Sequence, residues 1–204
     1  LVEEVIRIIG YDEVPTIPLS APIPHQIRTP SIDLRNALRD SFASVGLQET
    51  ISYPLITLES LKQCVPLLDE QIPLQVANPM NAEQEYLRPS LRPSILQTLQ
   101  YNQTHTDPET PIRLFESGRV FLQNKPNLPR EKDMIVGVIS GPLTPPSWIT
   151  SNNNTDFFDL KGLVHAGLQK VGINETYEAH SEMCFKESCC ARILVNGSEV
   201  GIIG

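Results

Sequence analysis

Apolar residues spaced three and four positions apart predict several helices along this 204-residue chain. In the clearest case, Ser31 is expected to cap the start of a helix and Gly46 to end it. The apolar stripe of this helix consists of Leu34, Ala37, Leu38, Phe42 and Val45. The same spacing predicts helices over residues 1–9, 57–65 and 160–171, and another from about residue 90 onward.

Strands are predicted between these helices, where apolar residues alternate with polar ones or run without interruption. Asn196 and Gly197 favour a tight hairpin turn near the end of the chain. The expected strands cover residues 48–55, 74–77, 113–122, 134–140, 191–195 and 200–203. Helices and strands in mixed order, with hairpin connections, indicate an α+β fold in which helices flank an antiparallel sheet.

Prolines mark a boundary near the start of the chain. The segment Val14–Pro30 contains prolines at 15, 18, 22, 24 and 30, which favour extended backbone. It is either a free linker or a strap laid over a surface, and Ile17, Leu19 and Ile23 favour the strap. Because both ends stop inside a predicted element, we expect a segment of a longer polypeptide, truncated at its C-terminus. Its expected parts are the remnant of a preceding small domain over 1–13, the strap over 14–30 and a core domain over 31–204.

The acidic composition limits the partners that we expect. The formal charge is −8, with 24 Asp and Glu against 16 Lys and Arg, so the average surface repels phosphate. No stretch approaches the roughly 20 apolar residues that span a bilayer, which predicts a cytoplasmic protein with no membrane partner. The 4 cysteines are expected to be reduced, because their spacing matches neither a disulfide framework nor the paired ligands of structural zinc.

Four blocks of sequence, taken in order, resemble one family over nearly the whole chain. They are LVEEVIRIIGYDEVP at 1–15, RDSFASVGLQETISYPL at 39–55, VANPMNAEQEYLRPSLRPSILQTLQYN at 76–102 leading into LFESGRVF at 114–121, and DLKG at 159–162 joined to ARILVNGSEVGIIG at 191–204. The blocks are similar to the β subunit of phenylalanyl-tRNA synthetase, which implies a class II aminoacyl-tRNA synthetase-like core. Residues 180–193 depart from the family, because the expected histidine is present as His180 but an expected proline is absent, and Cys189 and Cys190 are unusual.

The resemblance also implies that this core does not catalyse. Enzymes of this class join an amino-acid carboxylate to the α-phosphate of ATP, and the developing charge needs a fixed arginine together with magnesium. In the catalytic α subunit of the family an arginine follows Gly-Arg-Val-Tyr, whereas here Leu122 follows the corresponding Gly-Arg-Val-Phe. No catalytic or cofactor-binding residue is therefore expected in this chain.

The sequence allows more than one role for three arginines of this chain. Arg119 is interpreted as pairing with a carboxylate such as Glu116, with a catalytic role as the alternative, and the parity of the strand decides which face it occupies. Arg88 and Arg92 are interpreted as solvated or structural residues. The alternative for these two is the bidentate binding of a partner's carboxylates or of tRNA phosphate.

Partners and cofactors follow from the resemblance. The chain is expected to pair with the catalytic α subunit in an α2β2 heterotetramer that also binds tRNA. The helix over 31–45 and the following strand correspond to the interface unit of this class, so Leu38, Phe42 and Val45 are candidate contacts, although core packing is an equally good use for them. Glu3 and Glu4 match a glutamate pair that helps to hold magnesium in the intact subunit.

The predicted function is a non-catalytic structural module that supports the α subunit as it attaches phenylalanine to its tRNA. ATP is expected on the partner subunit, and the chain alone is expected to be inactive and to hold no cofactor. The alternatives are an enzyme domain that itself binds ATP or an amino acid, and a tRNA-binding module.

Overall fold

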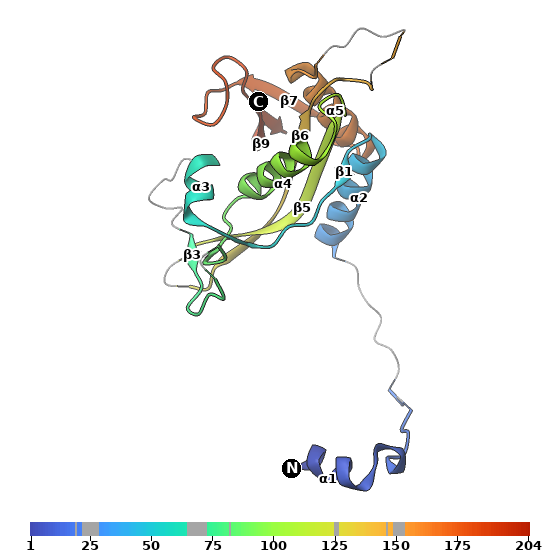
Figure 1. The fold of residues 1–204 in the computed structure, drawn as a ribbon. Helices are drawn as coiled ribbons and strands as arrows, with labels where there is room; N and C mark the ends of the chain where they lie inside the picture. The colour runs from blue at the N-terminus through green and yellow to red at the C-terminus, as the bar shows by residue number, and fades with distance from the viewer. Residues whose placement is uncertain are drawn as a thin grey trace.

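The computed structural model describes residues 1–18, 20–21, 29–64, 73–81, 83–124, 127–145, 147–148 and 154–204 (Figure 1). Its helices are α1 (Val2–Ile9), α2 (Pro30–Ser44), α3 (Leu58–Cys64), α4 (Arg92–His105) and α5 (Phe157–Lys170), with a 3-10 turn η1 (Tyr11–Glu13). Its strands are β1 (Gln48–Glu49), β2 (Leu55–Ile56), β3 (Leu74–Gln75), β4 (Tyr86–Leu87), β5 (Ile112–Leu122), β6 (Arg130–Ser140), β7 (Glu175–Ala179), β8 (Ala191–Val195) and β9 (Ser198–Ile203). The predicted mixture of helices and strands is confirmed.

A long antiparallel hairpin of β5 and β6 forms the centre of the fold. Its register runs from Ile112 opposite Ser140 to Leu122 opposite Arg130. β1 pairs with the other edge of β5 in parallel orientation, so the prediction of an antiparallel sheet is wrong for this strand. The chain passes through α3 and α4 between β1 and β5, and a crossover of this kind permits parallel pairing.

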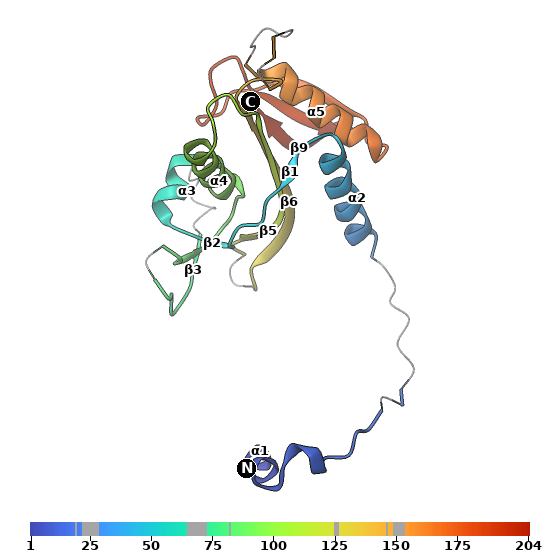
Figure 2. The same cartoon turned by 45° about the vertical axis from the view of Figure 1, so that its right-hand side comes forward.

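Helices cover both faces of this sheet (Figure 2). Phe115 packs with Phe42 and Leu47 on the side of α2 and α5. On the opposite side, Ile112 and Leu114 pack against Ile95 of α4. Side chains alternate along a strand, so the odd-numbered residues of β5 face α2 and α5 and the even-numbered residues face α4.

Two small antiparallel sheets complete the described fold. One has the strand order β2-β4-β3, and the other has the order β7-β8-β9. Asn196 and Gly197 connect β8 to β9 with φ angles of 51° and 76°, which confirms the predicted hairpin. β7 was not predicted, because its inward positions are Glu175 and Tyr177 rather than aliphatic residues.

The first helix of the core differs from its prediction at the start and agrees at the end. Pro30 is the first helical residue of α2 and Thr29 precedes it, so the assignment of Ser31 as N-cap is wrong. Proline is favourable at this position because the N–H that it lacks has no helical partner there. Gly46 follows the helix with a φ of 97°, as predicted for its end. The strand that follows is shorter than predicted, because only Gln48 and Glu49 pair with β5.

The proline-rich segment is only partly described. Ile17 is 84% exposed, so it does not pack on a surface as the strap interpretation expects. Leu19 and Ile23 lie outside the described residues. Within the described ranges, no helix has the length and apolar character needed to cross a bilayer.

Candidate functional site

Leu122 and Arg119 lie on opposite faces of β5. By the alternation of side chains, Leu122 shares the face of Glu116 beneath α4, whereas Arg119 points the other way. Arg119 Nη1 lies 2.5 Å from Glu131 Oε2 and Nε lies 3.6 Å from Asp133 Oδ1. The hydrogen bond to Glu131 is the main cause that raises the pKa of Arg119. Arg119 therefore pairs with carboxylates as predicted, but the suggested partner Glu116 is wrong because it lies on the opposite face.

A buried ionic cluster of Arg88, Glu116 and Ser52 occupies the face of β5 beneath α4. Arg88 Nη1 lies 2.7 Å from Glu116 Oε1, and the two residues are 4% and 2% exposed. The Ser52 hydroxyl accepts a 2.7 Å hydrogen bond from Arg88 Nη1 and donates a 2.7 Å hydrogen bond to Glu116 Oε2. Both charges are thus paired and hydrogen-bonded, which is the condition under which buried charges are tolerated.

The backbone on both sides fixes Arg88 in this cluster. Its N–H donates to the Pro54 carbonyl and its carbonyl accepts from the Phe121 N–H, both at 2.9 Å. Its Nε donates to the Arg119 carbonyl at 3.1 Å. A guanidinium held in this way is turned inward, so the structural interpretation of Arg88 is confirmed.

Arg92 joins the start of α4 to the segment whose sequence departs from the family. Its Nη1 pairs with Glu182, and its guanidinium lies 5.0 Å from the centroid of the Phe185 ring. Both partners belong to residues 180–193, so the structural interpretation of Arg92 is confirmed as well. Burial is the main cause that raises the pKa of the nearby Cys190 thiol.

Over the described ranges, no group of three or more His, Cys, Asp or Glu side chains could hold a metal ion.

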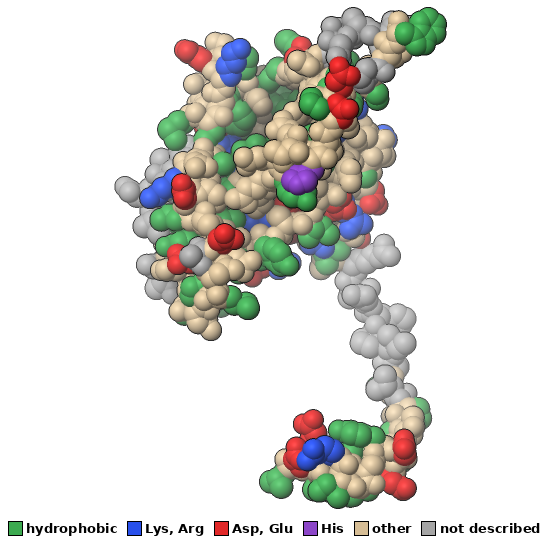
Figure 3. Space-filling view, viewed as in Figure 1, with side chains coloured by type: hydrophobic (Ala, Val, Ile, Leu, Met, Phe, Trp, Pro, Cys, Tyr) green, Lys and Arg blue, Asp and Glu red, His purple; other side chains and the backbone are tan. Residues whose placement is uncertain are grey.

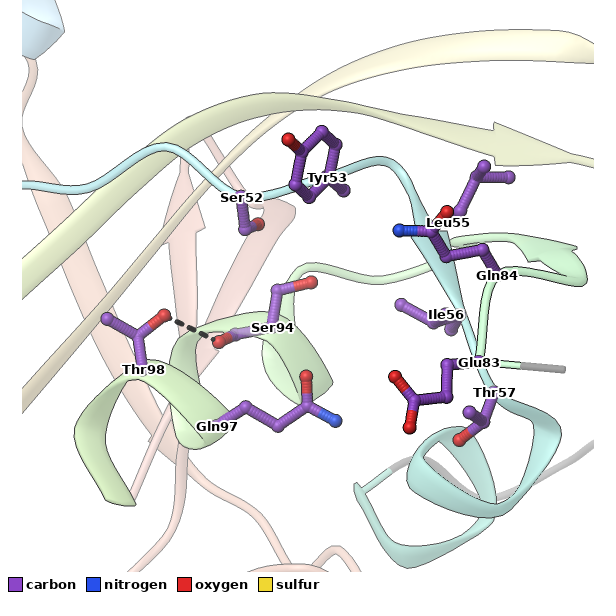
Figure 4. A pocket seen from close by; sticks show the side chains of 10 residues that line it. All are labelled: Ser52, Tyr53, Leu55, Ile56, Thr57, Glu83, Gln84, Ser94, Gln97 and Thr98. Atoms are coloured by element: carbon purple, nitrogen blue, oxygen red, sulfur yellow. Dashed lines mark hydrogen bonds between the residues drawn. The ribbon is translucent and has the colours of Figure 1, made fainter. Parts of the chain in front are cut away.

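A polar pocket of about 480 Å³ opens beside the ionic cluster, between α4, the segment 52–57 that includes β2, and Glu83 with Gln84 (Figure 4). The Glu83 carboxylate and the Gln97 amide point toward each other across it, and the Ser94 hydroxyl points into it from α4 (Figure 4). The space-filling view shows that the face over α4 is mostly uncharged, with charged side chains at its margins (Figure 3). The lining residues are Ser52, Tyr53, Leu55, Ile56, Thr57, Glu83, Gln84, Ser94, Gln97 and Thr98.

This pocket was missed in the sequence. The only local signal is that Ser94, Gln97 and Thr98 follow helical spacing on α4. A polar stripe of this kind ordinarily indicates a solvated helix face. The pocket forms only because Ser52 and Glu83, from distant parts of the chain, lie opposite that stripe.

A second polar cluster, also missed in the sequence, joins α5 to β7. Glu175 Oε1 accepts hydrogen bonds from His165 Nδ1 at 2.7 Å and from the Tyr177 hydroxyl at 3.2 Å. Burial raises the pKa of Glu175. The hydrogen bond from His165, the backbone hydrogen bond of Glu175 itself, the charge of His165 and the hydrogen bond from Tyr177 together outweigh burial, so the net pKa is lowered. Burial and the Glu175 charge raise the pKa of Tyr177. The Glu175 side chain is 1% exposed, so this carboxylate helps to hold α5 on the β7 sheet.

The remaining predicted site residues lie away from the pocket. Glu3 and Glu4 are exposed in the first turn of α1, and Glu4 Oε2 pairs with Arg7 Nη2 at 2.8 Å. Phe42 is 9% exposed in the core, and Leu38 and Val45 pack against the same cluster. The stripe of α2 therefore serves core packing, one of the two uses that its sequence allowed.

Comparison with known proteins indicates one family. Residues 14–204 match the family model of the phenylalanyl tRNA synthetase beta chain CLM domain. A phenylalanine–tRNA ligase beta subunit of Dehalococcoides mccartyi (strain CBDB1) is 34% identical over 205 residues, which cover 100% of this chain and 25% of that protein. The corresponding subunit of Vibrio vulnificus (strain YJ016) is 35% identical over 209 residues, covering 100% of this chain and 26% of that protein. The chain thus spans about a quarter of the length of these relatives.

The fold also has a counterpart among solved structures. A pyrrolysyl tRNA synthetase of Desulfitobacterium hafniense superimposes with a TM-score of 0.59 at 18% identity, over 84% of this chain and 55% of that chain. Identity at this level concerns the fold alone. The described elements therefore share their fold with part of that chain.

Proposed function

Because the chain belongs to the CLM-domain family of phenylalanyl-tRNA synthetase β chains, we propose that it is a non-catalytic structural module of that subunit. In this proposal it supports the α subunit in the ATP-dependent attachment of phenylalanine to tRNA in the cytoplasm. The observation that carries the proposal is the face of β5 beneath α4. There Leu122 provides no charge, and the guanidinium of Arg88 is already paired with Glu116.

The electrostatics of this face favour a structural role over catalysis. When the amino-acid carboxylate attacks the α-phosphate of ATP, negative charge develops on the phosphate, and a fixed cation must stabilise it. Arg88 is neutralised by Glu116 and held by the Arg119 carbonyl, so its charge is not directed at a substrate. Arg119 lies on the other face and binds Glu131. On β5 itself this face therefore carries no cation, and the guanidinium of Arg88 that lies against it is already paired.

We propose that the unit formed by α2 and β1 meets the α subunit. Leu38, Phe42 and Val45 form the inner side of this unit, where they pack on the core and fix the helix. Exposed apolar side chains in or next to this unit are those of Ile32, Leu34 and Ile51, which are 44%, 47% and 92% exposed. β1 ends the order β1-β5-β6 of its sheet, so its outer edge is available to another chain. Exposed apolar side chains beside a strand edge are typical of an interaction surface.

The cofactors in this proposal belong to the intact α2β2 complex. ATP and tRNA are handled with the α subunit, and magnesium is held near Glu3 and Glu4 in the longer β subunit. These two carboxylates fit magnesium in kind, because the ion prefers oxygen ligands. They are insufficient by themselves, since Glu4 is paired with Arg7 and two carboxylates rarely make a dedicated site. The proposal therefore requires further oxygen ligands from the rest of the subunit.

Coexpression of the full-length β subunit with a tagged α subunit tests this function. We expect the two to copurify, and we expect Ile51→Asp to reduce the recovered β subunit by placing a charge in the contact. Glu109→Gln, an exposed change at a loop residue outside α2 and β1, is the control. The proposed interface is contradicted if the unmodified subunits do not copurify. It is also contradicted if Ile51→Asp leaves the recovered amount of β subunit unchanged. Saturable micromolar binding of ATP–magnesium or phenylalanine to the isolated β subunit contradicts the non-catalytic role.

A further inference from the structure

We propose that the pocket between α4, the segment 52–57 and Glu83 binds a small molecule that carries a primary ammonium group and no anionic group, such as an amino amide. This inference goes beyond the proposed function, because it concerns a site separate from the α2 and β1 unit. At about 480 Å³ the pocket lies within the range of about 300–1,000 Å³ that is usual for small-molecule sites.

The charge of the pocket selects a cationic group. Glu83 is the one charged residue among those that line it, and its carboxylate points inward (Figure 4). Glu83 has no ion-pair partner within the described ranges. A carboxylate with free oxygens, placed opposite amide and hydroxyl groups, matches an ammonium group that donates three hydrogen bonds.

A hydroxyl of α4 also faces this pocket. Ser94 is 4% exposed, and its hydroxyl points from α4 into the pocket (Figure 4). Its carbonyl accepts a 3.0 Å hydrogen bond from Thr98, whereas the hydroxyl makes no hydrogen bond to any described residue. The Ser94 hydroxyl can therefore accept a hydrogen bond from an ammonium group or donate one to the amide oxygen of a ligand.

The same lining excludes carboxylate and phosphate groups. No Lys, Arg or His lines the pocket. The nearest guanidinium is that of Arg88, which lies behind Ser52 and already pairs with Glu116. An anion would therefore meet Glu83 without a compensating cation, at a cost in free energy. Leu55 and Ile56 provide an apolar wall for the rest of an amino amide.

Two probes that differ only in one charged group test the inference. Leucinamide and leucine share an ammonium group and a side chain, but leucine also carries a carboxylate. Each is titrated into the full-length β subunit by ligand-observed NMR, with ATP as an anionic comparison. We expect saturable binding of leucinamide and none of leucine or ATP at this pocket.

Variants assign the signal to the pocket. Glu83→Gln is exposed enough to leave the fold intact, and we expect it to weaken leucinamide binding about threefold to tenfold through the loss of one charged hydrogen bond. Gln97→Phe fills the pocket from an exposed helix position and is expected to abolish binding. Glu109→Gln removes the same charge elsewhere and is expected to have no effect.

Three results overturn the inference. They are the absence of leucinamide binding, binding that Glu83→Gln and Gln97→Phe leave unchanged, and leucine binding that depends on Glu83. None of these bears on copurification with the α subunit, so the failure of this inference is distinguishable from failure of the proposed function.

Discussion

The guanidinium of Arg88 lies against the backbone of Gly118, in the space that a side chain at that position would occupy. A Cβ at Gly118 would lie 2.5 Å from Arg88 Nη2 and 3.3 Å from Glu116 Oε1. The φ of Gly118 is not in the left-handed region, so close approach rather than backbone conformation requires glycine here. The buried ionic cluster therefore depends on the absence of a side chain on β5.

Gly118→Ala is expected to destabilise the fold by about 1–3 kcal/mol, because the added methyl group overpacks a site where Arg88 cannot withdraw. Urea unfolding followed by circular dichroism measures the change. Gly201→Ala on β9 is a suitable control, since the nearest atom to a Cβ there is a flexible side-chain carbon at 3.7 Å. Equal effects of the two substitutions would show that the contact with Arg88 is unimportant.

Arg88→Met is expected to cost about 3–5 kcal/mol, because it leaves the Glu116 carboxylate buried without its cation. The double variant Arg88→Met with Glu116→Leu removes both charges and is expected to recover most of that loss, because apolar pairs often replace buried ion pairs at little cost. Unfolding free energies of the two single variants and the double variant give the coupling. Arg119→Met, which breaks an exposed pair with Glu131, is the control and should change stability little. Additive effects at Arg88 and Glu116 would contradict the prediction.

The local sequence pattern predicts the helices well, because an apolar stripe and the residues that end a helix lie close together in the chain. Phe42 falls on the apolar stripe of α2 and Gly46 ends that helix with a positive φ, and both features are visible within one window of sequence. The parallel pairing of β1 has no such local signal. It depends on α3 and α4 lying between β1 and β5, so the orientation is decided by the path of the chain.

The polar sites were not predictable for the same physical reason. Arg88 is separated from Glu116 by 28 residues and from Ser52 by 36, and no spacing rule connects positions so far apart. Glu116 and Arg119 are different, because the alternation of side chains along the predicted strand 113–122 already puts them on opposite faces. Leu122, in contrast, can be recognised in the sequence. It directly follows the Gly-Arg-Val-Phe motif, at the position where the catalytic subunit of the family has an arginine.

Helices α2 and α5 also approach closely through a glycine. A Cβ at Gly167 would lie 2.6 Å from Cε1 of the Phe42 ring, and the Ser41 hydroxyl donates a 2.5 Å hydrogen bond to the Gly167 carbonyl. Gly167→Ala is expected to lose about 1–2 kcal/mol net, because overpacking outweighs the gain in helix propensity. Gly162→Ala, on the same helix with nothing within 4 Å of its Cβ, is expected to stabilise by up to about 1 kcal/mol. Thermal unfolding of the two variants distinguishes the effects, and a stabilised Gly167→Ala would contradict the close packing.

The buried carboxylate of Glu175 should make stability depend on acid pH. Its pKa in the folded chain is lowered below the ordinary value of about 4.3, because the hydrogen bond from His165, with further contributions from the backbone of Glu175, the His165 charge and Tyr177, outweighs burial. A lowered folded pKa contributes stability that is present above the unfolded pKa and is lost as pH falls through the folded pKa. The wild-type chain is therefore expected to lose stability relative to Glu175→Gln as the pH is lowered from 7 to 3.

Urea unfolding of both proteins at several pH values in this range measures that difference. Glu178→Gln on the exposed side of the same strand is the matched control, and its difference from wild type should change less over the same range. A difference between wild type and Glu175→Gln that stays constant or grows toward pH 3 would contradict the lowered pKa. It would then follow that His165 and Tyr177 do not hold the charged form of Glu175, and that α5 is held on β7 by packing alone.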